Sequence, residues 1–429
     1  MLRRNFFASA IALFAGAKLF ATRRVIAGAD EKFAILHEPV VVGGGEDAVV
    51  ISVVANKLSL AQVEVASVVD PSFKKPRVFV QSAVSGKKHL GTVHNIKISG
   101  LKGGAKYRYR IILKEVKKYW EPYRKGEKYG ETVLGETLDI SKNSDGRPLE
   151  FTTPTAGAES LSFAVINDLH ENRKKYGALL SGLKHSEYDF IVANGDSVNY
   201  MMTEPQLFGS AIGCVADAQK GVKPVYFLRG NHETRGKLAE EYFTYYPTVS
   251  GKSYFAFKAA GVFFIFLDVC EDKPDNSTEG AHLNNFTDYR NEEFDWLRGV
   301  LASSECRNSK RRVVVQHIPS PFEYVAYSGK RDKRMASLLH GANIDLMIAA
   351  HMHEYKYLKK GDSVLDLIKG KAYWERLFQR YIPEAEKKIT YPIVVNSNTE
   401  SMLVKVTPKS INIEFRGLDG GKSRPDIVV

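Results

Sequence analysis

The fold is decided by Ser162-Phe163-Ala164-Val165-Ile166-Asn167-Asp168-Leu169-His170, in which an apolar run ends in polar residues. The same order recurs at Phe190–Asp196, which ends in Asn-Gly-Asp, and at Val225–Glu233, which ends in Arg-Gly-Asn-His-Glu. Continuous apolar runs are typical of strands that are covered on both faces. We therefore expect a domain of the α/β class from about residue 161 onward.

Three more apolar runs continue the pattern. They are Val262–Leu267, which reaches Asp268, Arg312–Val315, which reaches Gln316-His317, and Ile344–Ala349, which reaches Ala350-His351-Met352-His353. In open α/β sheets, ligands bind at the carboxyl ends of the strands. We therefore expect the polar residues that follow these six runs to converge on one site.

Seven of these polar residues carry an oxygen or imidazole donor, and none is a cysteine. Each one alone would more often be a cap, a turn residue or a hydrogen-bonded core residue. Together they suit hard or borderline divalent metals. One ion needs fewer ligands, whereas two ions that share a bridging carboxylate would use them all. The predicted metal ligands are Asp168, His170, Asp196, Asn231, His317, His351 and His353.

The order of the motifs adds a family resemblance. Asp-x-His, Gly-Asp, Gly-Asn-His-Glu, a single His after a strand and His-x-His follow one another, and this order resembles the calcineurin-like metallophosphoesterase family from about residue 161 to the end of the chain. The resemblance implies a division of ligands. Asp168, His170 and His353 would hold the first metal, Asn231, His317 and His351 would hold the second, and Asp196 would bridge the two.

The resemblance also implies a chemistry. The cofactor would be two divalent metal ions, of manganese, iron or zinc, and a metal-activated hydroxide would attack phosphorus. The catalytic residues would be Asp196, as the bridge, and His232, which protonates or supports the departing alkoxide. Glu233 would orient the His232 ring or a metal ligand. Arg235 would either contact the phosphate or form a surface salt bridge.

The predicted function is that of a metal-dependent phosphatase that hydrolyses phosphate monoesters. A phosphodiesterase is the alternative, because it would use the same residues. A non-catalytic binding or adhesion protein is a third interpretation, which the complete ligand set disfavours.

Short β-branched runs separated by Gly, Pro, Ser or Lys precede this domain and predict a small β-sandwich. They include Ala48–Val54, Arg77–Val80 and Val93–Ile98, and in Lys106–Ile111 tyrosines alternate with basic residues, as in a strand with one buried face. Leu101, a glycine-containing turn and Tyr-x-Tyr resemble the tyrosine corner of fibronectin type III and immunoglobulin-like domains.

A sandwich ahead of a metallophosphoesterase domain is similar to the architecture of purple acid phosphatases, but two details differ. That branch has a tyrosine ligand three residues after the bridging aspartate, where this chain has Asn199, and it lacks the histidine that stands here as His170. Tyr200 is one position away, so its side chain should point in a different direction.

The first thirty residues predict an export signal. Arg3 and Arg4 precede an apolar run that is too short to span a bilayer, and Ala27-Gly28-Ala29 offers a cleavage site. The arginine pair favours a twin-arginine route over an ordinary secretory signal. We expect an exported protein, periplasmic or extracellular in a bacterium, without a membrane span, because no other apolar run reaches about 18 residues. The predicted division is residues 1–29 (signal), 30–155 (fibronectin type III-like sandwich) and 156–429 (metallophosphoesterase domain).

Composition supports this assignment weakly. The 429 residues carry a net charge of +12, which favours anionic ligands such as a small phosphate ester. The basic residues are scattered, so we predict no nucleic-acid partner.

Two inserts each have two interpretations. The charged one at about 114–146 is a solvated hairpin or a cover for a neighbouring site, and the near-helical one at about 362–390 is a pocket wall or core.

Overall fold

The computed structural model describes Gly28 and residues 31–69, 72–119, 132–155, 157–320, 334–371, 375–376, 382 and 387–429. Apart from Gly28, the predicted export signal lies outside these residues. Within the described part of the chain, no helix combines the length and the apolar character that crossing a membrane requires.

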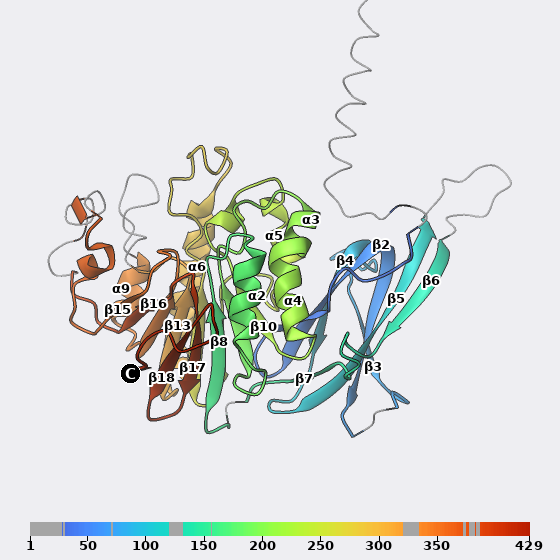
Figure 1. Ribbon diagram of the computed structural model, residues 1–429, viewed down its shortest axis with the longest axis horizontal. Helices are drawn as coiled ribbons and strands as arrows, with labels where there is room; N and C mark the ends of the chain where they lie inside the picture. The colour runs from blue at the N-terminus through green and yellow to red at the C-terminus, as the bar shows by residue number, and fades with distance from the viewer. Residues whose placement is uncertain are drawn as a thin grey trace, which may run out of the picture.

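The first of two mixed β-sheets contains the strands predicted from the first three apolar runs (Figure 1). Strands β8, β9 and β10 pair in parallel, so their carboxyl ends lie along one edge. Strands β17, β18 and β19 extend the sheet in antiparallel fashion beyond β8. The bounds are β8 Leu161–Ile166, β9 Phe190–Asn194, β10 Val225–Leu228, β17 Glu400–Val406, β18 Ile411–Gly417 and β19 Ile427–Val428.

The second sheet has the strand order β11-β12-β13-β14-β16-β15. Its four central strands, β12, β13, β14 and β16, are parallel, and β11 and β15 close the two edges in antiparallel fashion. The bounds are β11 Phe255–Ala259, β12 Val262–Leu267, β13 Arg311–Gln316, β14 Leu346–Ala349, β15 Lys356–Leu358 and β16 Ile393–Val395.

The two sheets face each other, and helices cover their outer faces. Successive strand residues point to opposite faces, so Phe163 and Val165 of β8 enter the core between the sheets, while Ala164 and Ile166 pack under α2 and α4. Helices α6 and α9 cover the second sheet in the same way. The helical segments are α2 Arg173–Ser181, α3 Glu204–Gln206, η1 Leu207–Ala211, α4 Ile212–Gln219, η2 His232–Thr234, η3 Ala239–Glu241, α5 Tyr242–Tyr245, α6 Phe286–Ala302, α7 Ser304–Arg307, α9 Arg334–His340 and η4 Val364–Ile368.

The N-terminal strands continue the first sheet. Strand β1 pairs in parallel with β10 and in antiparallel fashion with β2, so the ladder runs unbroken from the α/β part into the β-rich part. The first half of the 20-residue β2 pairs with β1 and β4, and its second half pairs with β3 and β5. The bounds are β1 Val40–Gly43, β2 Ala48–Ser67, β3 Arg77–Val80, β4 Gly91–Ser99, β5 Lys106–Lys118, β6 Val133–Ile140 and β7 Glu150–Thr152.

The two tyrosines of the predicted tyrosine corner have different partners. The hydroxyl of Tyr107 accepts a hydrogen bond from the backbone N–H of Lys102, at 2.8 Å, which is the upstream backbone contact of such a corner. The hydroxyl of Tyr109, which is completely buried, donates to the carbonyl of Gly221 at 2.7 Å. Because Gly221 follows α4, this second bond joins the β-rich region to the α/β part.

The expected arrangement of parallel strands with a β-rich region ahead of it is present, but several elements differ from the prediction. Strands β1 and β11 were not predicted, and β2 is much longer than the expected run at Ala48–Val54. Strand β6 pairs with β5, so the described part of the charged insert is a hairpin. In the second insert, Val364–Ile368 forms a 3-10 turn, and most of residues 372–386 lie outside the described residues.

Candidate metal centre

The predicted donors follow the carboxyl ends of the parallel strands, where the chain turns sharply. Backbone φ angles are positive, between 44° and 71°, at five of the seven donors. A non-glycine residue in this region costs on the order of 1–3 kcal/mol and persists only where the surroundings impose it. Such strain turns the side chains toward a common point. The five residues are Asp168, His170, Asp196, His351 and His353.

Four donors form a first group, in which one atom from each residue lies within 4.8 Å of the others. Nε2 of His353 lies 3.4 Å from Oδ1 of Asp168 and 3.0 Å from Nε2 of His170. Nε2 of His170 lies 4.0 Å from Oδ2 of Asp196. These contacts bring together residues from the first, second and fifth motifs.

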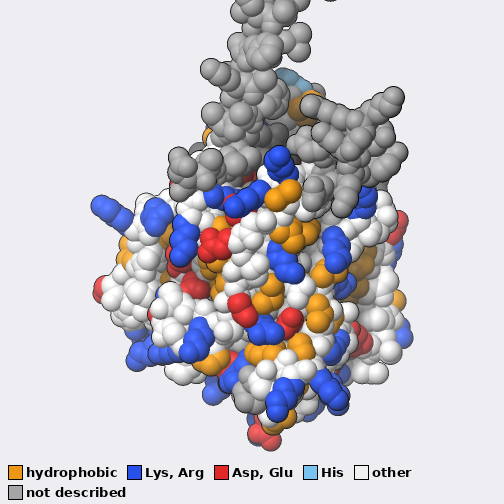
Figure 2. Space-filling view, turned by 90° about the vertical axis from the view of Figure 1, so that its right-hand side faces the viewer, with side chains coloured by type: hydrophobic (Ala, Val, Ile, Leu, Met, Phe, Trp, Pro, Cys, Tyr) orange, Lys and Arg blue, Asp and Glu red, His pale blue; other side chains and the backbone are white. Residues whose placement is uncertain are grey.

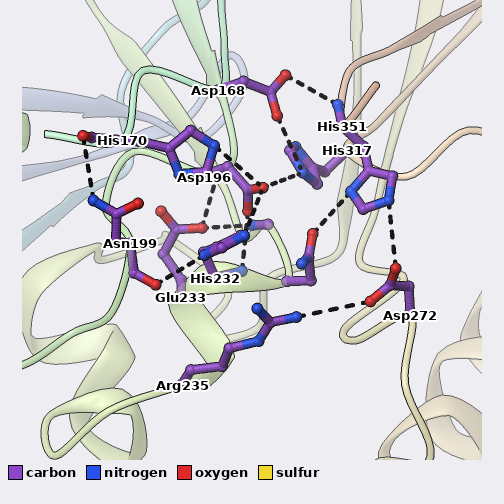
Figure 3. A network of polar contacts seen from close by, with 12 residues as sticks. Asp168, His170, Asp196, Asn199, His232, Glu233, Arg235, Asp272, His317 and His351 are labelled. Carbon is purple, nitrogen blue, oxygen red and sulfur yellow. Dashed lines mark hydrogen bonds and ion pairs between the residues drawn. The ribbon is translucent and has the colours of Figure 1, made fainter. Parts of the chain in front are cut away.

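A second group consists of Asp196, His317 and His351, and it shares Asp196 with the first group (Figure 3). Nε2 of His317 lies 3.2 Å from Oδ2 of Asp196. Oδ1 of Asn231 lies 3.0 Å from Nδ1 of His351, which places the amide beside this group. The structure thus brings all seven predicted donors into one place.

Unpaired buried atoms test whether these groups fit cations. Oδ1 of Asp168 and Nε2 of His317 are buried and have no hydrogen-bond partner in the structure. Nδ1 of His317 is 2.7 Å from the carbonyl oxygen of Asn194, which can only accept, so Nδ1 is the donor. The inward-facing Nε2 is then available as a ligand. Unpaired buried polar atoms are costly, and a cation between them would remove this cost, so the residues fit two metal ions.

The electrostatics of the pocket favour positive charge. Burial alone would lower the pKa of His317, but the carboxylates of Asp196 and Asp168 outweigh it and raise the pKa to about 10. In the first group, burial lowers the pKa of His170. The buried carboxylates therefore draw a positive charge toward the point where the two groups meet.

His232 lies at the side of the pocket with its ring held from one end. Its Nδ1–H donates to the carbonyl of Asn199 at 2.8 Å, which leaves Nε2 to face the site, 3.8 Å from Oδ2 of Asp196. The ring packs against His170 and Tyr200, with centroid distances of 4.7 and 6.2 Å. Asn199, at the position of the family tyrosine ligand, thus acts through its backbone. Tyr200 is 46% exposed.

The contacts of Glu233 fit the second of its two expected roles, which is to orient a predicted metal ligand. Its carboxylate does not reach the ring of His232 in the structure. It accepts instead from the backbone N–H groups of Asp196, Ser197 and Gly230, at 2.9, 2.6 and 2.8 Å. Burial and the charge of Asp196 raise the pKa of Glu233 to about 7. Glu233 therefore holds the turn that carries Asp196.

The salt bridge of Arg235 is buried and does not lie at the surface as expected. Arg235 is 5% exposed, and its guanidinium makes two hydrogen bonds to Glu271, of 2.7 and 2.8 Å. Its Nη2 also lies 3.7 Å from Asp272, whose Oδ2 lies 3.6 Å from Nε2 of His351. Sequence reasoning missed Asp272 because it sits on a loop five residues beyond Leu267, the predicted end of β12. Its only signal was the Glu-Asp pair after that strand.

Comparison with known proteins relates the α/β part to known phosphoesterases. Residues 161–355 match the calcineurin-like phosphoesterase family. Purple acid phosphatase 22 of Arabidopsis thaliana is 25% identical over 250 residues, which cover 54% of this chain and 53% of that protein. Probable purple acid phosphatase 20 of the same plant is 25% identical over 318 residues, covering 68% of this chain and 67% of that protein. The chain thus spans about half the length of the first of these relatives.

A solved structure extends the likeness to most of the chain. The purple acid phosphatase PPD1 from yellow lupin (Lupinus luteus) seeds superimposes with a TM-score of 0.55 at 11% identity, covering 91% of this chain and 73% of that chain. At this identity the likeness concerns the fold, and it confirms the predicted fold class. Over residues 161–355, the α/β part of this protein is thus similar to the calcineurin-like phosphoesterase family.

Proposed function

We propose that the protein is a dinuclear metal-dependent phosphatase that hydrolyses phosphate monoesters. One observation carries this proposal: two groups of donors, which follow the ends of the four strands β8, β9, β13 and β14, share the carboxylate of Asp196. The purple acid phosphatase names of the relatives support a phosphatase, and the donor types fit manganese, iron or zinc.

The division of roles follows from the contacts. Asp168, His170 and His353 would hold one cation, Asn231, His317 and His351 would hold the other, and Asp196 would contact both. When bound, two such cations lower the pKa of water and neutralise charge on phosphate oxygens. Glu233 keeps the Asp196 turn in place, and the carbonyl of Asn194 fixes the tautomer of His317, so the donors are oriented before any substrate arrives.

His232 would serve the leaving group. Because Asn199 occupies its Nδ1–H, only Nε2 can carry a proton toward the site. A protonated Nε2 donates to the oxygen of the departing alcohol and so reduces the charge that this oxygen develops. The partial exposure of the ring, 24% for the side chain, leaves room for that group.

A substrate panel tests the proposal. The purified protein, loaded in turn with manganese, zinc or iron, is assayed with a matched aryl phosphate monoester and diester. We expect two metal ions per chain and faster monoester turnover. Faster diester turnover would favour the alternative, a phosphodiesterase, which uses the same residues. A metal-loaded protein that is inert toward every phosphate ester would instead favour a binding or adhesion role.

His232→Ala is expected to lower kcat by about 10²- to 10⁴-fold while the metal content stays at the wild-type value, because the ring donates a proton and is not one of the seven ligands. Metal analysis and steady-state kinetics of the same preparation measure both. His89→Ala, which removes a partly buried histidine of the β-rich region far from the donor groups in sequence, is the control and should change neither value. Loss of metal in the His232 variant would contradict the assigned role.

We also propose the division of the chain into an export signal at residues 1–29, a fibronectin type III-like region at 30–155 and the phosphoesterase domain at 156–429. The proposed location is outside the cytoplasm, periplasmic or extracellular in a bacterium. Mass spectrometry of the protein recovered from a bacterial host is expected to show a mature N-terminus near residue 30. Recovery only of the full-length chain from the cytoplasm would contradict export.

A further inference from the structure

One contact near the site, between His351 and Asp272, has no role in the proposed reaction. The side chain of Asp272 is 11% exposed, and its Oδ2 lies 3.6 Å from Nε2 of His351. The other ring nitrogen, Nδ1, faces Oδ1 of Asn231 at 3.0 Å. The imidazole of His351 is therefore placed between an amide oxygen on the side of the donor groups and a carboxylate on the opposite side (Figure 3).

Asp272 is itself held firmly. Its Oδ1 lies 2.6 Å from Nζ of Lys273 and 3.7 Å from Nη2 of Arg235. Arg235 in turn is fixed by two hydrogen bonds to Glu271. One oxygen of Asp272 is thus occupied by cationic groups of the protein, while the other is directed at the ring of His351.

The same contacts argue against Asp272 as a metal ligand. The donor atoms of each group lie within 4.8 Å of one another. Among the residues that the structure describes, Asp272 belongs to neither group. A ligand histidine commonly donates its second N–H to a carboxylate, which fixes the tautomer and the ring orientation. Asp272 stands where this acceptor would be needed.

We propose that Asp272 is a positioning residue for His351: its carboxylate, 3.6 Å from Nε2, attracts the proton to that nitrogen, so that Nδ1 presents its lone pair beside Asn231 and Asp196. The inference rests on the proposed function, because it assigns His351 to the second cation. The backbone is already restrained, since His351 has φ 71° and its N–H donates to Oδ2 of Asp168 at 3.0 Å. Asp272 supplies the remaining restraint, which is the rotation and protonation of the ring.

The consequence is a connection between the metal centre and the loop after β12. Asp272, Glu271 and Arg235 form one buried charged network, and Arg235 directly follows the 3-10 turn that carries His232. Removing the carboxylate of Asp272 would free the ring of His351 without touching the first group of donors. Loss of this carboxylate should therefore weaken the binding of the second cation more than that of the first.

The test uses the full-length protein loaded with Mn²⁺ and compares the wild type with Asp272→Ala and Asp272→Asn. We expect Asp272→Ala to raise the Kd of the weaker Mn²⁺ site by about 10- to 100-fold, as measured by titration calorimetry. Electron paramagnetic resonance should change from a spin-coupled pair to isolated Mn²⁺. The Asn variant keeps an oxygen acceptor without the charge, so its Kd should lie between the other two.

Two controls make the result specific. Asp275→Asn alters the same loop, where Asp275 bonds with Thr287, and should leave both Mn²⁺ sites unchanged. In a His351→Ala background, Asp272→Ala should have no further effect on Mn²⁺ binding, because the ring that it positions is gone. An independent effect of the same size in that background would overturn the proposal.

The outcomes separate this inference from the proposed function. If the wild type binds two Mn²⁺ ions and hydrolyses phosphate esters, but Asp272→Ala binds them equally well, only the role of Asp272 is wrong. If the wild type binds no Mn²⁺, both are wrong. If Asp272→Ala does not fold, Asp272→Asn is used as the test. A wild-type Kd for the weaker Mn²⁺ site in Asp272→Asn would then overturn the proposal.

Discussion

Asp196→Asn is expected to reduce phosphate-ester hydrolysis to the background rate and to lower the metal content from two ions per chain to one or none. Asp196 is the residue that the two donor groups share, so its charge acts on both cations at once. No other described donor has that position, and a second carboxylate cannot compensate for its loss.

The contacts of Asp196 explain why an isosteric change to asparagine is expected to remove both the activity and the metal. Its Oδ2 faces Nε2 of His317 at 3.2 Å, and its Oδ1 accepts the backbone N–H of His232 at 3.0 Å. Burial opposes the charged form, yet His317 and His232 hold the pKa of Asp196 below its usual range. An asparagine keeps the size but removes the charge, and an amide NH₂ cannot serve as a ligand.

Metal analysis after gel filtration, together with kinetics at saturating Mn²⁺, measures both effects. Asp139→Asn, which removes a half-exposed carboxylate 3.3 Å from Arg110, is the matched control and should retain both ions, since exposed ion pairs contribute little. Two tightly bound ions in the Asp196 variant would show that this carboxylate is not the bridge.

Glu233→Ala is expected to destabilise the protein by roughly 3–5 kcal/mol and to abolish activity as a result, although Glu233 is not a predicted ligand. Its carboxylate is 1% exposed and accepts hydrogen bonds from the backbone N–H groups of Asp196, Ser197 and Gly230. Alanine leaves these donors buried and unpaired, and each costs about 1–3 kcal/mol. The turn that aims Asp196 into the site would then relax.

Denaturant unfolding measures the stability, and metal content measures the effect on the site. Glu240→Ala, an exposed position in the next helical turn, should stay within about 0.5 kcal/mol of the wild type. Glu233→Gln keeps one acceptor oxygen but sets an NH₂ group against a backbone donor. Its free energy of unfolding should therefore lie between those of the wild type and Glu233→Ala. Wild-type stability in Glu233→Ala would show that the turn carrying Asp196 is stable without the Glu233 carboxylate.

The sequence was sufficient to predict the parallel strands and the set of donors. The reason is that apolar runs such as Phe190–Asn194 and Val262–Leu267 are buried on both faces, which makes them continuous and easy to recognise. Since parallel strands end along a common edge, the residues after them had to lie near each other. This local rule placed His317 and His351 together although 33 residues separate them in the numbering.

Features that depend on distant pairing could not be predicted in this way. Strand β1 is a short run whose place beside β10 depends on contacts with residues far along the chain. The surface salt bridge predicted for Arg235 was also wrong, because its partner Glu271 lies on a loop whose position exists only in the folded molecule. Of the two roles predicted for Glu233, its contacts fit the orientation of a metal ligand and not that of the His232 ring. Asp272 follows no strand end directly, and its link to His351 arises from that same loop.

The insertion of β1 beside β10 has a consequence for how the protein can be divided. If the chain were shortened to residues 156–429, β10 would lose its neighbour on one side, and its N–H and C=O groups there would face solvent. Exposed strand edges recruit other chains and lead to aggregation. We therefore expect the β-rich region to protect the α/β part against aggregation by covering this edge of β10.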